Sequence, residues 1–507
     1  MPTYFFWILY SGIGAVFFNT AFGQPKFGAF GWLLGFACTF LLHHKFPSLF
    51  FGDNNADFSH VRGAKIVSNA KLLALSKNEK HAEIPVIIGD VPVPFSLENR
   101  HFLFVGSTGS GKSQSFLQVA KVARLRGNGA VIADVDGELT SMFYRHGVDI
   151  LLSPFDKRSP AWSPLAEMEG VRDADRIAKS IISDGDGSSK EWNSYAQFIL
   201  SSVLLKIWQS NGTNGDLVHY LMFSKNEDLK ALCSGSEASR MFEDGSEKML
   251  ASVLSIVSSF SRMLNKLDKN ANADSFSITK FVKENAEKNT GKWLFMPVRD
   301  DMFPMLSPLI AAQVDISISA LLTSKNDDQR RAWFFVDEFA TWGKIEGIEP
   351  LLTKSRKKGG CAVLGLQNVS QARENYGKER SQTLLSSCGT WLTLRSTDGD
   401  TAEFLSRNIG DEDIRRVINS SSDQGSSTSE QFSKQRVILP SELQKLPDLE
   451  GVLNIAGPLP AGWVSIKYMP PQRNVEPFDL KDEGAIKKLL DEEEQERVEM
   501  ETDGFIP

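Results

Sequence analysis

The stretch "GSTGSGKS", Gly106–Ser113, decides the fold prediction because it matches the pattern G-x-x-x-x-G-K-[ST]. In this pattern, the glycines let consecutive backbone N–H groups turn toward phosphate oxygens, the lysine reaches the β- and γ-phosphates, and the hydroxyl binds Mg²⁺. A chance glycine-rich turn is the alternative interpretation. The flanks favour a phosphate site, because residues 101–105 predict a buried strand and residues 114–126 predict a helix whose amino terminus points at the phosphates.

We therefore predict that this loop binds ATP together with Mg²⁺. The residues expected to contact the nucleotide are Gly106, Ser107, Thr108, Gly109, Ser110, Gly111, Lys112, Ser113 and Gln114. Lys112 is also a catalytic candidate, and Ser113 is a candidate metal ligand.

A second motif follows the apolar residues 332–336, which end in Asp337 and Glu338. In P-loop enzymes that hydrolyse nucleotides, an aspartate at such a strand end holds Mg²⁺, and a second carboxylate orients or polarises the attacking water. We predict these roles for Asp337 and Glu338, respectively. The alternative is a helix start capped by an acid.

The next predicted strand, residues 362–366, is followed by Gln367. An amide at this point can hydrogen-bond the γ-phosphate or its water, so Gln367 is a further catalytic candidate. A role in capping the following helix is compatible with this prediction.

The remaining pattern predicts an α/β fold with a parallel sheet and an inserted helical domain. Further strands are predicted over residues 130–134, 149–152, 293–298, 391–395 and 452–456. Residues 165–296 contain no proline, and apolar residues recur there at helical spacing. An all-α insertion explains why Lys112 and Asp337 lie so far apart in the sequence.

The first fifty residues differ in character from the rest. Residues 4–22 and 27–42 contain no charged residue and are separated by the turn Gly23–Lys26. The first segment has about the ~20 residues that cross a bilayer, so we predict a transmembrane helical hairpin. The alternative, a signal peptide, lacks its basic region and its cleavage site. The positive charges that follow the hairpin place the phosphate loop in the cytoplasm.

Charge and cysteine content narrow the function classes. The net charge is −7, and residues 479–507 hold eleven acidic and four basic residues, so the acidity is concentrated in this tail and the body is close to neutral. There is thus no global basic field to draw the protein onto nucleic acid. We expect a mobile tail that is either merely solvated or a docking segment. The four cysteines lack the spacing of a zinc site or a disulfide framework.

The basic segment "SRKKGG", Ser355–Gly360, lies between two predicted strands of the active region. Solvated surface is the usual interpretation of such a run. In a ring-shaped ATPase, an arginine here faces the ATP of the neighbouring subunit and stabilises the transition state. We choose Arg356 for that role, and the alternatives are Arg330, Arg331 and Arg395.

Several motifs in order resemble the type IV coupling proteins, the TraD/TrwB-like family of conjugation. They are "GAKIVS" (63–68), the phosphate loop, "DVDGE" (134–138), "SPFDKRSPAWSPL" (153–165), "FFVDEFA" (334–340), "GLQNVSQ" (365–371) and "VILPSELQKLPDLEG" (437–451). The resemblance implies a RecA-like P-loop ATPase that forms a homo-hexamer anchored in the bacterial inner membrane. It also implies the roles stated above for Lys112, Ser113, Asp337, Glu338, Gln367 and Arg356.

The same resemblance predicts partners and domains. The expected partners are DNA in the ring pore, a relaxase with relaxosome accessory proteins, inner-membrane components of the type IV secretion channel, and the lipid bilayer. The expected domains are a transmembrane hairpin (1–45), a nucleotide-binding domain in two parts (46–160 and 276–475), the all-α insertion (161–275) and the acidic tail (476–507). Two alternative functions stay open: a receptor for protein effectors, and an FtsK-like translocase, which would need a DNA-reading domain that the short acidic end does not supply.

Overall fold

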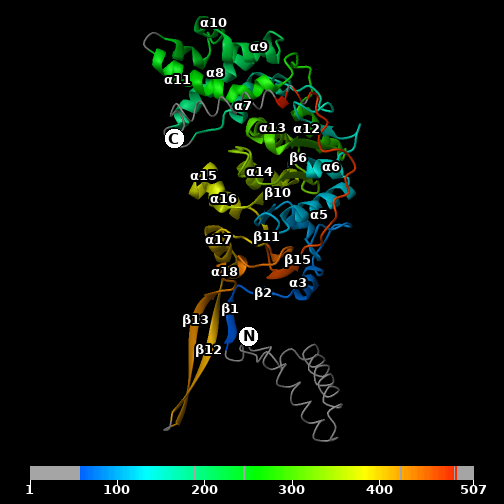
Figure 1. The fold of residues 1–507 in the computed structure, drawn as a ribbon, viewed down its shortest axis with the longest axis vertical. Coiled ribbons are helices and arrows are strands. Elements are labelled where there is room, and N and C mark those ends of the chain that lie inside the picture. Colours follow the sequence, from blue (N-terminus) through cyan, green and yellow to red (C-terminus); the bar gives the residue numbers. More distant parts are fainter. Residues whose placement is uncertain are drawn as a thin grey trace, which may run out of the picture. The chain divides into compact units, whose positions relative to one another are not determined.

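The computed structural model of the chain describes residues 58–185, 187, 189–243, 246–422, 425–482, 484 and 486–487. Figure 1 shows the ribbon. The predicted transmembrane hairpin and most of the acidic tail lie outside these residues. The described chain forms two units, Ala64–Gly410 with Val437 onward, and a smaller one that contains Asp411–Arg436.

Within the described residues, ten strands of the larger unit form one sheet in the order β2-β15-β14-β11-β5-β10-β9-β6-β8-β7. Their bounds are β2 (Ile66–Val67), β15 (Ala461–Ser465), β14 (Glu450–Ile455), β11 (Thr390–Thr393), β5 (Phe102–Val105), β10 (Gly360–Leu366), β9 (Ala332–Val336), β6 (Gly129–Val135), β8 (Trp293–Val298) and β7 (Ile150–Leu151). From β11 to β7 all neighbours are parallel, whereas β14 is antiparallel to both β11 and β15. The predicted α/β fold with a parallel core is confirmed, with boundaries that differ by a few residues.

Both faces of the sheet are covered by helices, as the nearly continuous apolar strands require. One face packs against α3 (Asn69–Ser76), α4 (Phe95–Glu98), α5 (Lys112–Leu125) and α6 (Glu138–Phe143). The other face packs against α12 (Ile278–Lys288), α13 (Phe303–Thr323), α14 (Ile348–Lys354), α15 (Val369–Tyr376), α16 (Lys378–Ser386), α17 (Gly399–Ile409) and α18 (Pro440–Leu443). Figure 1 shows α5 and α6 on one side of the strands and α14 to α16 on the other.

The helix α13 illustrates how deeply this second layer is buried. With the residues just before it, it is the one described helix that is long and apolar enough to cross a membrane, but most of it is covered by the rest of the protein. It contacts β6, β8 and α7. We therefore regard α13 as a core helix of the sheet domain.

A helical region is inserted between the neighbouring strands β7 and β8. It contains α7 (Val171–Ile181), α8 (Ser189–Gln209), α9 (Asn214–Val218), α10 (Asn226–Leu232) and α11 (Glu247–Ser261), and the short helices η2 (Pro164–Glu167), η3 (His219–Phe223), η4 (Glu237–Phe242) and η5 (Arg262–Lys266). The chain entering and the chain leaving this region meet, because Trp162 and Phe276 form a parallel bridge and the Phe276 N–H donates to the Ala161 carbonyl at 3.1 Å. The domain boundaries themselves stay predictions.

The smaller unit is a three-stranded antiparallel sheet of β1 (Phe58–Gly63), β12 (Asp411–Ser422) and β13 (Gly425–Arg436). The sequence prediction included residues 411–436 in the second part of the nucleotide-binding domain, whereas the structure separates them as a long hairpin. The segment is rich in serine and lacks apolar alternation, so its sequence carries no strand signal. Its backbone is paired continuously from Asp411 opposite Arg436 to Ser422 opposite Gly425.

Residues 467–482, which we call the C-terminal strap, run from the end of β15 across the larger unit. The backbone N–H of Asp479 donates to Asp156 Oδ2 at 2.9 Å, and Lys157 Nζ lies 2.9 Å from Asp479 Oδ1. The Lys481 N–H donates to the Phe155 carbonyl, also at 2.9 Å. The acidic tail was expected to be mobile from Asp479 onward, but its first three residues are bound to the loop at 154–158, because backbone pairing holds them there.

The larger unit also contains a small hairpin and two further short helices. The strands β3 (Ile87–Ile88) and β4 (Val91–Pro92) form a small hairpin, and the short helices η6 (Asp300–Met302) and η7 (Ser355–Lys358) precede α13 and β10.

Candidate nucleotide site

The loop between β5 and α5 is fixed to both neighbouring strands. The Gly106 N–H donates to the Leu366 carbonyl at the end of β10 at 3.1 Å, and the Ser107 N–H donates to the Arg395 carbonyl beyond β11 at 2.8 Å. The helix α5 then begins at Lys112, directly after the loop. The first N–H groups of a helix lack intrahelical partners, so they are available to an anion at this place.

Glycine is required in this loop for two different reasons. Gly109 and Gly111 have φ values of +78° and +110°, which side chains on L-residues rarely permit. Gly106 has an ordinary backbone, but a β-carbon there would overlap Ser110 Oγ and the Leu394 side chain. The loop is therefore shaped by its glycines and not merely flexible.

A buried lysine and two carboxylates meet beside the loop. Lys112 is 6 % exposed, and its Nζ forms an ion pair with the Glu338 carboxylate and lies 3.2 Å from Asp337 Oδ1. Gln367 Nε2 donates to Glu338 Oε1 at 2.5 Å. The structure thus brings together four of the predicted site residues from three separate segments.

The strand register explains this convergence. In the parallel sheet, Leu366 of β10 lies opposite Val105 of β5, and Leu364 of β10 lies opposite Val336 of β9. The residues that follow these three strands therefore emerge at one edge of the sheet. Here and below, the two edges are the one formed by the carboxyl ends of the parallel strands and the one formed by their amino ends. This edge, where parallel strands end, is where α/β proteins bind their ligands.

No helix starts at Asp337, so the capping interpretation of the two carboxylates is wrong. Residues 337–342 form turns, and Glu338 has a φ of +50°. The Thr341 N–H and hydroxyl both donate to the Glu338 carbonyl, at 2.7 and 2.8 Å, and Trp342 Nε1 donates to the Asp337 carbonyl at 2.8 Å. These bonds hold Glu338 in its left-handed conformation.

Gly365 on β10 is also set by this site. A β-carbon at Gly365 would overlap the Asp337 carboxylate, which lies across the neighbouring strand end. The Gly365 carbonyl in turn accepts from the Phe339 N–H at 3.0 Å. The glycine therefore makes room for the acidic side chain beside it.

These groups match the chemistry of a phosphate chain with Mg²⁺. The lysine ammonium and the helix N–H groups are donors for phosphate oxygens, while carboxylate and hydroxyl oxygens are Mg²⁺ ligands. The buried Ser110 Oγ has no hydrogen-bond partner among the described residues. The described residues contain no cluster of three or more His, Cys, Asp or Glu side chains that could hold a metal ion.

Three predicted contact residues are placed less directly. Thr108 and Gly109 are exposed at the tip of the loop. The Gln114 side chain is engaged elsewhere, because its Oε1 accepts from the Met469 N–H of the C-terminal strap at 2.6 Å. On the next turn of α5, Gln118 Nε2 donates to the Lys467 carbonyl at 3.2 Å. The strap thus lies against the helix that leaves the phosphate loop.

Arg356 lies at the opposite edge of the sheet. It belongs to η7, immediately before β10, and it is exposed. The seven residues of β10 separate it from Gln367 by roughly 20 Å at strand geometry. No hydrogen bond or ion pair of the Arg356 side chain occurs among the described residues, and its carbonyl accepts from Asn99 Nδ2 at 3.4 Å.

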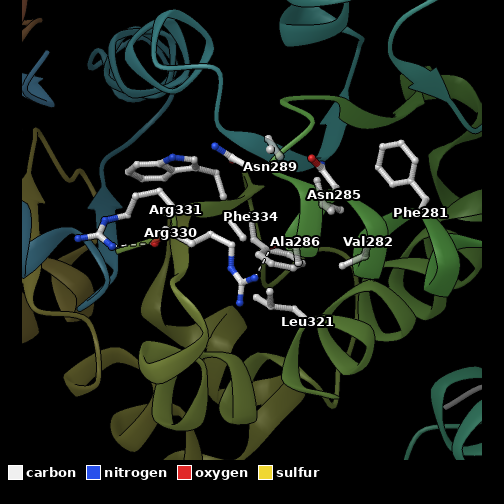
Figure 2. A pocket seen from close by; sticks show the side chains of 14 residues that line it. Phe281, Val282, Asn285, Ala286, Asn289, Leu321, Arg330, Arg331 and Phe334 are labelled. Carbon is white, nitrogen blue, oxygen red and sulfur yellow. Dashed lines mark hydrogen bonds between the residues drawn. The ribbon is translucent and has the colours of Figure 1, made fainter. Parts of the chain in front are cut away.

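The alternatives to Arg356 are engaged within the chain. Arg330 donates to the carbonyls of Ala286, Lys358 and Lys325 at 2.5, 3.0 and 2.8 Å. Figure 2 shows Arg330 beside Ala286 and Leu321. These residues line a pocket of about 20 Å³, which has room for a single water. Arg331 is 3 % exposed and pairs with Glu98 at 3.0 Å, and Arg395 pairs with Asp448 at 2.6 Å.

Sequence reasoning missed residues that support the loop from the far side. Leu449, with a φ of +64°, donates its N–H to the Ser110 carbonyl at 2.9 Å, and its side chain would contact a β-carbon at Gly111. The Thr397 N–H donates to Ser107 Oγ at 3.0 Å. The signal for Leu449 was present in the motif "VILPSELQKLPDLEG", to which no role had been given.

Glu138 was missed as well, although it ends the motif "DVDGE". It follows β6, the strand next to β9, and begins α6. The pKa of its carboxyl is raised, first by partial loss of solvent and then by the Asp337 carboxylate, while Arg473 of the strap opposes the change. Glu138 therefore belongs to the same electrostatic environment as Asp337.

The fold and this site define a P-loop nucleotide-binding protein. A family profile described as "Type IV secretion-system coupling protein DNA-binding domain" matches residues 85–467. The unbound monoclinic form of the conjugative coupling protein TrwB is 30% identical, with a TM-score of 0.76 over 83% of this chain and 96% of that one. The chain belongs to the type IV coupling protein family, and the predicted RecA-like fold is confirmed.

Further relatives were found among solved structures and characterised proteins. TrwB in complex with ADP and Mg²⁺ is 30% identical, with a TM-score of 0.74 over 83% of this chain and 96% of that chain. The coupling protein TraD of Escherichia coli (strain K12) is 29% identical over 427 residues, which are 82% of this chain and 59% of TraD. VirD4 of Agrobacterium fabrum is 26% identical over 62% of this chain and 50% of VirD4. The chain thus spans little more than half the length of these two relatives.

Proposed function

We propose that this protein is a membrane-anchored hexameric ATPase that couples ATP hydrolysis to DNA translocation through a type IV secretion system in conjugation. The observation that carries the proposal is the convergence of Lys112, Asp337, Glu338 and Gln367 beside the phosphate loop. P-loop enzymes use a lysine for the phosphates, an aspartate for Mg²⁺ and a residue that positions the attacking water, and candidates for all three roles meet here.

Each residue of the site has a proposed role. Lys112 leaves its carboxylate partners to bind the β- and γ-phosphates, assisted by N–H groups of residues 106–114. Ser113 and Asp337 hold Mg²⁺, which supplies positive charge that neutralises phosphate oxygens. Glu338 polarises the attacking water, and Gln367 orients it. TrwB binds ADP with Mg²⁺ and non-hydrolysable analogues of ATP and GTP, which supports ATP and Mg²⁺ as the ligands here.

Arg356 is proposed to act on the ATP of the neighbouring subunit in a ring. Its exposure and its place at the far edge of the sheet support a role between subunits, because within one chain it lies too far from the loop. Such an arginine stabilises charge on the transferred phosphoryl group and increases the rate by ~10³ to 10⁵.

The partners follow from the family. DNA passes through the pore of the homo-hexamer and is held by phosphate contacts without sequence reading. A relaxase with relaxosome accessory proteins delivers the DNA, and inner-membrane components of the secretion channel receive it. The amino-terminal segments anchor the protein in the bacterial inner membrane, and the helical insertion faces the cytoplasm.

The test is the rate of ATP hydrolysis per subunit, measured on the purified full chain over a wide range of protein concentrations, with and without single- or double-stranded DNA. We expect the rate to rise steeply with protein concentration and further with DNA, because the site is completed between subunits. The Lys112→Thr variant measures contaminating activity. A rate per subunit that is independent of concentration and of DNA would contradict the proposal.

A further inference from the structure

The segment that follows β6 reaches the same edge of the sheet as Asp337. Ala133 of β6 lies opposite Val336 of β9 in parallel register, so both chains leave the sheet side by side. Beyond β6, Asp136 and Gly137 have φ values of +58° and +64°, and this tight turn starts α6 at Glu138. The turn therefore returns the chain toward the neighbouring carboxylates.

The backbone on both sides of Glu138 is held by hydrogen bonds, while part of the Glu138 side chain stays open to solvent. The buried Asp134 accepts from the N–H of Leu139 at 3.2 Å and from the N–H and hydroxyl of Thr140, each at 2.6 Å. The Asp136 N–H donates to the Val298 carbonyl at 2.8 Å. The Glu138 carboxylate, in contrast, has no hydrogen-bond or ion-pair partner among the described residues. The Glu138 carboxylate is therefore a hydrogen-bond acceptor that is available to a bound ligand or water.

The C-terminal strap covers this turn. The Asn474 N–H donates to the Ser141 carbonyl at 2.8 Å, and Asn474 Nδ2 donates to the Met142 carbonyl at 2.6 Å. A β-carbon at Gly137 would approach the Pro477 side chain at 2.7 Å. These contacts hold the exposed Arg473, which precedes Asn474, close enough to Glu138 for their charges to attract.

We propose that Glu138 is a positioning residue of the nucleotide site, which accepts hydrogen bonds from water bound to Mg²⁺, and that Arg473 orients its carboxylate. This inference rests on the proposed function. Mg²⁺ keeps several of its waters in protein sites, and those waters are donors that carboxylates orient. The charges of Glu138 and Asp337 repel each other, so a cation near both is favoured. Glu138 thereby makes nucleotide binding more dependent on Mg²⁺.

The measurement is the ADP affinity of the purified full chain by titration calorimetry, once with excess Mg²⁺ and once with EDTA. The ratio of the two dissociation constants is the readout, because a loss of fold or of the phosphate loop changes both constants alike. For Glu138→Gln we expect the Mg²⁺ enhancement to fall by roughly 10-fold, the size of outer-sphere effects at metal sites, with the EDTA value unchanged. Arg473→Gln is expected to lower it by roughly 2- to 5-fold, because attraction between exposed charges that are not in direct contact is weak.

Two further variants make the result decisive. Glu379→Gln removes an exposed glutamate at the start of α16 and should leave the ratio unchanged. Glu138→Asp keeps the charge and should retain more of the enhancement than Glu138→Gln. An unchanged ratio in Glu138→Gln, or an equal loss of ADP affinity with Mg²⁺ and with EDTA, overturns the inference. If Lys112→Thr binds ADP like the unaltered chain, the proposed nucleotide site fails instead.

Discussion

The two edges of the large sheet use buried charge in opposite ways. At the edge where the strands end, Lys112 and Gln367 both contact the Glu338 carboxylate, which is partly open to solvent. At the edge where the strands begin, Glu98 is fully buried and is bound by Arg126 at 2.8 Å and by Arg331 at 3.0 Å. We infer that charged partners which a bound ligand can replace, as around Glu338, serve function. Buried charged partners that no ligand replaces, as around Glu98, serve stability.

His101 is another buried group whose hydrogen-bond partners serve stability. It is buried at the start of β5, its Nδ1 accepts from the Ala362 N–H at 3.1 Å, and its Nε2 donates to the Leu352 carbonyl at 3.0 Å. Burial lowers its pKa to about 4, so the ring is neutral at physiological pH. It ties β5 and β10 to α14, the helix that leads into the segment with Arg356.

The largest effect, on the rate of ATP hydrolysis, is expected at the edge where the strands end. Lys112→Thr should reduce ATP hydrolysis to background, a loss of at least ~10³-fold, because it removes the cation that we propose contacts the phosphates. Glu338→Gln should lose ~10² to 10⁴ in rate while it still binds ADP. Steady-state phosphate release measures both. Lys121→Thr, an exposed lysine on the same helix, is the matched control, and normal turnover in Lys112→Thr would remove the assignment.

Arg356→Ala tests whether the edge where the strands begin also takes part in ATP hydrolysis. We expect a loss of ~10³ to 10⁵ in the rate of hydrolysis with ADP affinity unchanged, because we propose that the arginine acts on the ATP of a neighbouring subunit. Mixing this variant with Lys112→Thr should restore some activity, since hybrid interfaces then contain one intact site. Lys357→Ala, its exposed neighbour, should behave like the unaltered chain. If no mixing ratio restores activity, Arg356 has no role between subunits.

Glu98→Gln tests whether the buried charges at the edge where the strands begin serve stability. The change leaves the Arg126 and Arg331 guanidinium groups without their buried counter-charge, and the free energy of unfolding should fall by about 3 to 5 kcal/mol. Denaturant titration measures this loss, and ADP affinity of the folded protein should stay the same. Glu403→Gln breaks an exposed pair with Arg407 and should cost less than about 1 kcal/mol. Equal losses in the two variants would contradict the contrast between the edges.

His101 predicts a smaller, pH-dependent effect. The folded protein keeps this ring neutral down to a pKa of about 4, while the unfolded chain protonates it near 6.5. Protonation therefore favours the unfolded state, and the free energy of unfolding should decrease by up to about 3 kcal/mol as the pH falls from 6.5 to 4. His101→Gln should remove this part of the pH dependence, and the exposed His146→Gln should not. Parallel pH profiles for His101→Gln and the unaltered chain would refute the assignment.

The functional edge could be predicted from the sequence because its chemistry is written in short segments. Lys112, the pair Asp337 and Glu338, and Gln367 each follow an apolar strand, and parallel strands place such residues at one edge. The alternation of strands and helices likewise predicted the parallel core. The roles of these residues stay proposals, but their convergence required no more than the strand pattern.

The rest depends on contacts between distant segments that leave no local signal. Glu98 and Arg331 are typical surface residues by composition, and only the fold buries them together. The β12–β13 hairpin is held by backbone pairing beneath a serine-rich sequence. The C-terminal strap was hidden because its contacts are made largely through backbone atoms, which every sequence has.

The fit between Gly365 and Asp337 has a consequence for genetics. A methyl group at Gly365 would overlap the Asp337 carboxylate and displace it. Under the proposed function in conjugation, a random screen for alleles that abolish DNA transfer should therefore recover Gly365→Ala alongside changes at Asp337 itself. In such a screen, a variant of Gly365 would have the same phenotype as a variant of Asp337, the proposed Mg²⁺ ligand.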